Sequence, residues 1–185
     1  MGHVGVNAAV LADTAAHLMA DDKGILAIDE SNGPCDRRFA AVGIEQSEES
    51  RRRWRELIIN TPEIGQAVSG MTLYDETIHQ ATGSERCFVD VLTEAGILVG
   101  IKVDTGAKPL AGFSGETITE GLDGLRQRLL DHASIDARFT KWRAVFSAED
   151  AQPSLACIDA DAQALARGHL SEAPFQPFKP QVLKP

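Results

Sequence analysis

Short apolar runs recur along the chain, separated by longer stretches in which apolar and polar positions mix with a helical period. Four of these runs have the length of β-strands, at 24–29, 67–74, 97–104 and 139–146. In the third run the apolar residues follow one another without alternation, which is typical of a strand buried on both faces. The pattern therefore predicts four strands of a buried, parallel sheet.

The stretches between these runs predict helices. Capping residues and apolar spacing place them at 7–20, in a short segment before Gly43, from Ser47, from Ser84, from Thr119, and at 156–167. A Gly-rich loop is expected over 105–116. In the helix from Ser47, the expected buried stripe is Trp54, Leu57 and Ile58. Its arginines are expected on a solvated face, in the pairs Glu48–Arg52 and Glu49–Arg53, with Arg51 left open.

Strands that alternate with helices predict an α/β fold, in which right-handed crossovers build a parallel sheet. The four βα units amount to half of a closed (β/α)₈ barrel. The order ends near Gly168, after which the chain becomes proline-rich and loses its periodicity. We therefore divide the chain into an ordered half-barrel, 1–168, and a tail, 169–185.

Charged residues enter the buried runs only at or near their ends. Lys102 and Asp104 close the third run two positions apart, and Lys141 and Arg143 have the same spacing in the fourth. Residues two apart share one face of a strand, so each pair is expected to leave the sheet on one side. The first run ends in Asp29. Because a buried charge is costly unless it is paired or used, this edge of the sheet is the candidate site.

Composition narrows the function classes. The net charge of −9 argues against binding to nucleic acid or to an anionic membrane, and no apolar run approaches a bilayer span. We expect a cytoplasmic protein, because the N-terminus lacks a secretory pattern and the three cysteines show no paired spacing. The five histidines are scattered without metal-ligand spacing, so no metal site is expected.

Several separated motifs resemble class I fructose-bisphosphate aldolase. They are KGILAIDESNG at 23–33, GIKVD at 100–104, PLAG at 109–112, GET at 115–117, EGLDGL at 120–125 and KWR at 141–143. The resemblance keeps register over about residues 10 to 167. It implies a (β/α)₈ (TIM) barrel and cleavage of fructose 1,6-bisphosphate into dihydroxyacetone phosphate and glyceraldehyde 3-phosphate. It also implies a lysine Schiff base, with no cofactor and no metal.

The resemblance assigns catalytic roles to two residues. Asp29 is similar to the carboxylate that takes the C4-hydroxyl proton during carbon–carbon cleavage. Lys141 is similar to the lysine that stabilises developing charge and lowers the pKa of a neighbouring lysine. A carboxylate beside lysine ammonium groups stays ionised and can serve as a base. The alternative is that Asp29 only forms a structural ion pair with Lys102 or Lys141.

The resemblance implies contact with phosphate or another anionic group for five further residues. Lys102 and Arg143 are similar to groups that receive the distal phosphate of the sugar, which suits an ammonium and a guanidinium fork. Ser31 and Arg38 are similar to mobile first-loop groups that close on phosphate, and Arg51 to another arginine that faces the anion. A buried ion-pair network for the first two residues, and surface solvation for the arginines at 38 and 51, remain alternatives.

Two hypotheses from different classes remain at this stage. The first is a Schiff-base lyase of glycolysis and gluconeogenesis that takes a phosphorylated sugar. The second is an inactive half-barrel that binds phosphosugar weakly or self-associates, because the match ends before the sixth-strand lysine and fifth-strand glutamate of the family. A half-barrel leaves two strand edges unpaired, and a homodimer that closes eight strands would pair them. A third reading makes Lys141 or Lys102 the Schiff-base former.

Overall fold

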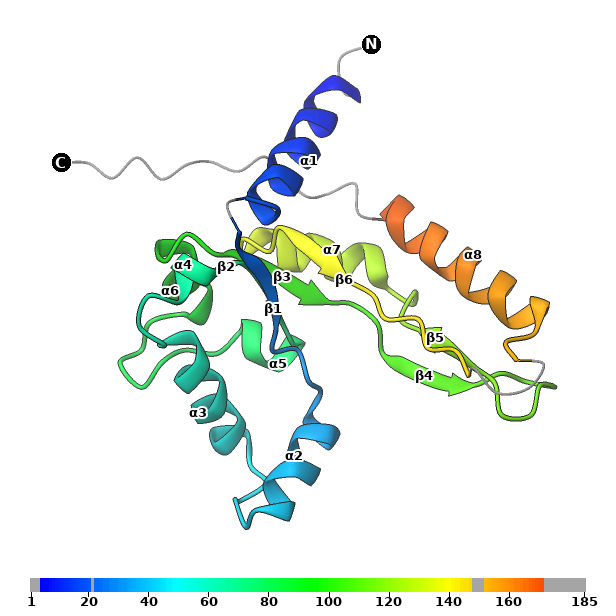
Figure 1. Ribbon diagram of the computed structural model, residues 1–185, viewed down its shortest axis with the longest axis horizontal. Coiled ribbons are helices and arrows are strands. Elements are labelled where there is room, and N and C mark those ends of the chain that lie inside the picture. The colour runs from blue at the N-terminus through cyan, green and yellow to red at the C-terminus, as the bar shows by residue number, and fades with distance from the viewer. Residues whose placement is uncertain (1–3, 21, 148–151, 172–185) are drawn as a thin grey trace.

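The computed structural model describes residues 4–20, 22–147 and 152–171 (Figure 1). A four-stranded parallel sheet forms its centre, with strands β1 (Gly24–Ala27), β2 (Val68–Leu73), β3 (Leu98–Lys102) and β6 (Phe139–Lys141) in the order β1-β2-β3-β6. The predicted parallel sheet is confirmed, although β6 is shorter than the expected 139–146. Most of the expected tail, 172–185, lies outside the described residues.

Helices follow the strands along the chain. They are α1 (Val4–Leu18), α2 (Asn32–Ala41), α3 (Glu48–Ile59), α4 (Ile64–Ala67), α5 (Asp75–Ile78), α6 (Phe88–Glu94), α7 (Leu125–Ser134) and α8 (Leu155–Ser171). The Ser47 cap is confirmed, since its Oγ accepts from the Ser50 amide at 3.2 Å. α6 begins four residues after the expected Ser84, whose hydroxyl instead bonds Thr82. α8 continues through Gly168 to Ser171.

The stretch from 105 to 120 differs from the sequence prediction. In place of a loop and the first turn of a helix, β4 (Gly106–Pro109) and β5 (Thr117–Glu120) form an antiparallel hairpin. Thr119 is part of β5, where its amide donates to Asp161 of α8 at 3.2 Å. The next helix begins only at Leu125, after Gly121 and Gly124 adopt positive φ. Long-range pairing with α8 therefore overrides the local helical pattern.

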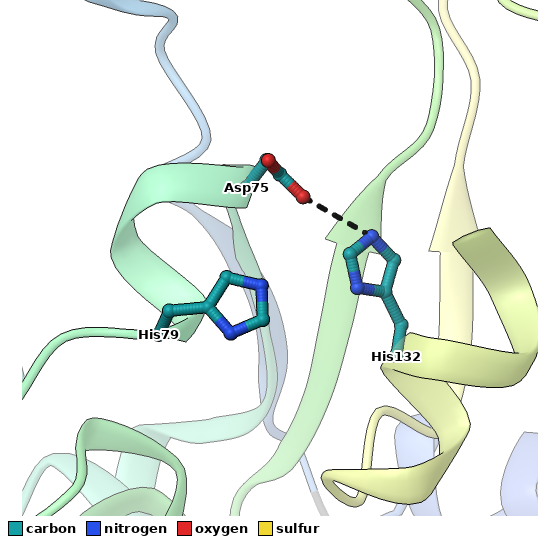
Figure 2. A group of neighbouring side chains, drawn as sticks. All are labelled: Asp75, His79 and His132. Carbon is teal, nitrogen blue, oxygen red and sulfur yellow. Dashed lines mark ion pairs between the residues drawn. The ribbon is translucent and has the colours of Figure 1, made fainter.

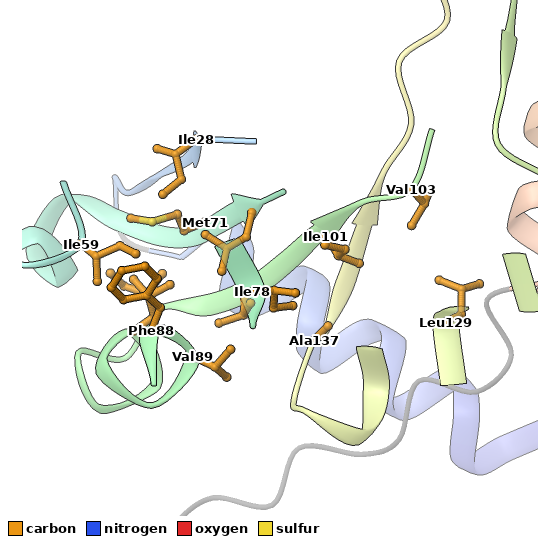
Figure 3. Close-up of a cluster of buried hydrophobic side chains, with 14 of the residues drawn as sticks. Ile28, Ile59, Met71, Ile78, Phe88, Val89, Ile101, Val103, Leu129 and Ala137 are labelled. Carbon is orange, nitrogen blue, oxygen red and sulfur yellow. The ribbon is translucent and has the colours of Figure 1, made fainter. Parts of the chain in front are cut away.

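One face of the sheet carries the apolar core. Met71, Leu73, Val99, Ile101 and Val103 alternate along β2 and β3 and are fully or almost fully buried. Helices α6 and α7 cover them with Phe88, Val89, Leu92, Leu125 and Leu129 (Figure 3). Full burial of such a side chain contributes roughly 2 kcal/mol. The core thus fixes the two central strands, of which β3 ends at Lys102.

The opposite face of the sheet is built differently. Gly70 and Gly100 lie diagonally across β2 and β3 on it, and the ring of Phe139 rests against them so closely that a Cβ on Gly100 would lie 2.4 Å from the ring. Lys102 and Lys141 lie two residues beyond Gly100 and Phe139 and so project from this same face. The lysines predicted from strand periodicity are therefore on the face away from the core.

The expected buried stripe of α3 is wrong in part. It fails at Trp54 and Leu57, which are exposed, but Ile58 is partly buried against the core, beside the buried Arg55 and Ile59. The guanidinium of Arg55 donates to the Glu30 carbonyl at 2.8 Å. The inward face of α3 therefore combines Arg55 with Ile58 and Ile59, while Trp54 and Leu57 lie at the surface.

Candidate functional site

The candidate site lies at the carboxyl ends of the parallel strands. Lys141, at the end of β6, donates from Nζ to Asp29 Oδ1 at 2.6 Å and to Oδ2 at 2.7 Å. The ladder extends past β1, because the Ile28 amide donates to Thr72 at 3.1 Å and so fixes the backbone beside Asp29. Asp29 is buried and Lys141 is about one-third exposed, with 35% of its side chain accessible.

This ion pair joins the two outer strands of the sheet. β1 and β6 are three strand spacings apart, which in a flat sheet would be about 14 Å. The side chains of Asp29 and Lys141 are too short together to cross that distance. Their contact at 2.6 Å therefore requires a sheet curved toward the face that carries the lysines. Curvature of this kind belongs to a barrel rather than to an open, flat sheet.

A second lysine–carboxylate pair stands beside the first. Lys102 Nζ donates to Asp104 Oδ1 at 2.6 Å and to the Asp104 carbonyl at 2.7 Å. The same carboxylate accepts from the amides of Gly106 at 3.1 Å and Arg143 at 3.3 Å. Asp104 is buried, so these bonds satisfy it while they fix Lys102 and the start of the segment after β6.

The two lysines are direct neighbours across adjacent strands. Lys102 of β3 and Lys141 of β6 are register partners, and each ammonium is neutralised by its own carboxylate. An ammonium has three donor hydrogens, and the bonds of Lys102 to Asp104 account for two. The pair of cations therefore has donor capacity for an anionic ligand without loss of either ion pair.

The structure brings together some of the expected phosphate-binding residues. Arg143 follows β6 with an exposed side chain, and its carbonyl accepts from Thr119 Oγ1 at 2.9 Å. Ser31 lies with Lys102 in an open pocket of about 360 Å³. Arg38 lies apart on α2, with 79% of its side chain exposed and an ion pair to Glu30 at 3.2 Å.

The pocket contains residues that the sequence reasoning missed. Besides Ser31 and Lys102 it is lined by Tyr74, Asp75, Asp104, Thr105, Gly106, Glu120, Gly121, Asp123 and Arg128. Tyr74 and Asp75 directly follow β2, the same position that drew attention to Asp29 and Asp104. Burial, together with the nearby Asp75 and Glu76 carboxylates, raises the pKa of the Tyr74 phenol. Position after a strand was thus an available criterion for both residues.

Arg51 serves a different role from the solvated or anion-facing one considered above. Its guanidinium contacts Glu76 with two nitrogens at 2.8 Å and Asp36 with a third at 2.8 Å. Bonding to Glu76, and then to Asp36, raises the pKa of Arg51. Glu76 also accepts from Asn32 at 3.0 Å. Arg51 therefore ties α3 to α2 and α5 in a network of fixed ion pairs.

The expected surface pair of Arg52 is wrong in its partner. Arg52 bonds Glu49 at 2.7 Å and Glu56 at 2.8 Å, in place of Glu48. Its guanidinium further reaches the carbonyl of Ala81 at 3.0 Å. Glu49 and Glu56 lie three and four residues from Arg52 on the same helix, so both carboxylates are within reach of its guanidinium.

Comparisons with known proteins agree on one family. The family model for fructose-bisphosphate aldolase class-I matches residues 10–171. A probable fructose-bisphosphate aldolase class 1 of Xylella fastidiosa is 54% identical over 157 residues, which is 85% of this chain and 47% of the relative. The cytosolic fructose-bisphosphate aldolase 4 of Arabidopsis thaliana is 48% identical over 153 residues, which is 83% of this chain and 39% of the relative.

A solved structure gives the same result at the level of the fold. The fructose-bisphosphate aldolase of Plasmodium falciparum, in complex with TRAP and a small-molecule inhibitor, superposes with a TM-score of 0.88 at 35% identity. The match covers 94% of this chain and 50% of that one. The expected barrel-type fold with about four βα units is confirmed. The chain spans about half the length of the curated relatives it matches.

Proposed function

Because the chain belongs to the class I fructose-bisphosphate aldolase family, whose members are lyases, we propose that its strand-end groups bind fructose 1,6-bisphosphate and take part in its cleavage. One observation carries this proposal: the bidentate contact of Lys141 with Asp29 directly beside Lys102. It joins a base candidate, a cation for developing charge and a cation for phosphate on one concave face. Structural ion pairing alone does not require these three groups to share a face.

In this proposal Asp29 accepts the C4-hydroxyl proton as the carbon–carbon bond breaks. Its two bonds from Lys141 hold the carboxylate in position to act as the base. Lys141 then shares its positive charge with oxygen atoms of the substrate as charge develops there. Both groups need only small movements, since Lys141 is already partly exposed.

Phosphate recognition falls to Lys102 and Arg143 in the same proposal. Asp104 holds Lys102 and the backbone of Arg143 together, so an ammonium and a guanidinium are available to one dianion. Ser31 reaches the pocket that contains Lys102. We propose Arg38 as a loop group that releases its single surface contact with Glu30 when it closes on phosphate.

The covalent step requires a lysine nucleophile. The resemblance assigns that role to a lysine on a sixth strand, and the parallel sheet among the described residues has four strands. Lys141 and Lys102 are therefore the lysines of this site that would show whether the chain alone retains covalent chemistry. Dihydroxyacetone phosphate followed by borohydride would convert a Schiff base into a stable adduct. Intact mass and peptide mapping would then locate it.

An adduct at Lys141 or Lys102 would support covalent chemistry within this chain. If this chain gave no adduct while a complete aldolase, run as the positive control, did give one, only the phosphosugar-binding part of the proposal would remain. Calorimetry with fructose 1,6-bisphosphate would test that remaining part. We expect Lys102→Met to weaken binding, and Lys108→Met, which removes an exposed lysine of β4, to leave it unchanged. Equal binding by both variants would overturn the phosphate role of Lys102.

Self-association is a second candidate function, favoured by the edges of the sheet. Among the described residues β1 and β6 each pair on one side only, and Ile25 of β1 is 49% exposed. A second copy would cover both edges and place two sets of Asp29, Lys102 and Lys141 around one pocket. Light scattering on the full chain would test this, and a strictly monomeric species would exclude it.

Cytoplasmic location remains a proposal, testable by fractionation. No helix among residues 4–20, 22–147 and 152–171 has the length and apolarity that a membrane span needs.

A further inference from the structure

Three side chains that the proposed lyase chemistry does not use converge beside the pocket. Asp75 begins α5, His79 follows the end of that helix, and His132 lies in the last turn of α7. Asp75 and His79 are four residues apart, so one helical turn brings them to the same side. Figure 2 shows the His79 ring facing the His132 ring, with the Asp75 carboxylate close to both. One ligand atom from each residue lies within 4.8 Å of the other two.

His132 is the buried member of the group. It is only 4% exposed, its Nε2 lies 3.3 Å from Asp75 Oδ1, and its Nδ1 has no hydrogen-bond partner among the described residues. A buried polar atom without a partner costs free energy, so this nitrogen calls for an explanation.

We propose that Asp75, His79 and His132 form a binding site for a divalent transition-metal ion of the Zn²⁺ class. Two imidazoles and one carboxylate are a ligand set that Zn²⁺ takes in proteins, with its fourth position open to water. Ligand atoms around tetrahedral zinc are about 3.4 Å apart, given bonds of about 2.1 Å. The present separations reach that value after small movements, which the exposed side chains of Asp75 and His79 permit.

The bound ion would join two elements that the chain itself connects only distantly. Asp75 and His79 belong to the segment after β2, whereas His132 belongs to α7. A metal ion shared between them would hold α5 against α7. This contact would lie at the rim of the pocket, because Asp75 also lines that pocket. The site is separate from the Asp29–Lys141 pair, and the ion takes no part in the proposed lysine chemistry. It is a stabilising site, whose occupancy should raise the melting temperature.

The rival explanation is a plain ion pair between His132 and Asp75 with His79 as a bystander. The two explanations differ in what His79 does, since only a metal site needs its nitrogen. Co²⁺ and Zn²⁺ on the tag-free, chelator-treated full chain distinguish them. Co²⁺ reports its ligands through visible absorption, and Zn²⁺ competition reports specificity. A Cys87→Ser background removes the exposed thiol as a competing ligand.

We expect one Co²⁺ per chain, absorption without a thiolate charge-transfer band, and displacement by Zn²⁺. His79→Gln should weaken binding by at least about tenfold, since even loss of a metal site's outer partners costs that much. His17→Gln is the matched control, because His17 is also an exposed histidine but lies on α1, away from the proposed site. This variant should leave the affinity for Co²⁺ unchanged.

Zn²⁺ should also raise the melting temperature of the parent chain but not of His79→Gln. Because His79 is exposed, this variant should fold as the parent does, which circular dichroism would verify. His132→Gln should abolish binding as well. The proposal is overturned if the parent binds neither ion at micromolar concentration, if the spectrum shows thiolate ligation, or if His79→Gln binds as tightly as the parent.

Discussion

The lysine pairs at the strand ends and the arginine pairs around α3 consist of the same kind of chemistry but are positioned by different means. Lys102 and Lys141 lie on adjacent parallel strands, and the core behind β2 and β3 fixes those strands. Arg51 and Arg52 lie on one helix, and their partners come both from that helix and from α2, α5 and the Ala81 carbonyl. A strand offers two faces, whereas a helix can rotate through many orientations. The side on which a charged side chain lies is therefore more narrowly determined at the strand ends than on the helix.

The largest difference between the two regions should follow removal of Lys141. Lys141→Met would leave Asp29 buried with its bidentate partner gone, and we expect a loss of about 3 kcal/mol in the free energy of unfolding. Urea denaturation at neutral pH would measure it, with Lys108→Met as the exposed-lysine control. The double variant Asp29→Asn/Lys141→Met should recover part of the loss. Equal stability of Lys141→Met and the control would break the comparison.

Arg51→Met should have the next largest effect. It removes a guanidinium that is 12% exposed and leaves Glu76 and Asp36, which are about one-fifth exposed, without their shared cation. We expect a loss of about 2 kcal/mol, less than at Lys141 because water can reach both carboxylates. Arg53→Met, an exposed change on the same helix, is the control and should be near neutral. If Arg51→Met exceeded Lys141→Met, the ranking of the two regions would reverse.

The pH dependence of the free energy of unfolding tests the pair of His132 with Asp75, which joins α7 to α5. Burial lowers the pKa of His132 in the folded chain, so the unfolded chain takes up the proton first as pH falls. Stability should therefore decline as pH drops below about 6.5, the unfolded value, and level off below the folded pKa. Urea denaturation across pH 5–8 in chelator, for the parent and His132→Gln, isolates this contribution as a difference. A difference that stays constant with pH would contradict it.

The smallest effect should come from Arg52. Both of its carboxylate partners belong to its own helix, and 61% of the Glu49 side chain is exposed, so water and salt screen that pair. Arg52→Met should change the urea midpoint only slightly, and the difference from the parent should vanish at high salt. A loss that persists at high salt would instead point to the bond with Ala81.

Sequence reasoning succeeded where a period of two leaves few choices. Lys102 and Asp104 were expected on one side of a buried strand, and their 2.6 Å contact follows from that alternation. It failed on α3, because Trp54 and Leu57 looked like a core stripe. The inward face instead carries Arg55, whose bond to the Glu30 carbonyl local spacing does not reveal, beside Ile58 and Ile59.

Other features depend on contacts between distant parts of the chain. The β4–β5 hairpin is held by Asp161 and by Glu116, which accepts from Ser154 Oγ at 2.6 Å, so residues in α8 and just before it decide the conformation of 105–120. The approach of His79 to His132 is likewise invisible in the sequence, where the histidines show no metal-ligand spacing. Such pairs become apparent only once the helices have packed.

The contact of Phe139 with Gly70 and Gly100 has a consequence for which lysine meets Asp29. The ring fits where two neighbouring residues have no side chain, and a Cβ at Gly100 would collide with it. If β6 slipped by one residue along β3, Thr140 would occupy that position and Lys141 would turn toward the core. The aromatic ring therefore permits only one register of β6 against β3. Two glycines and a phenylalanine, none of them chemically reactive, select the cation that faces the carboxylate.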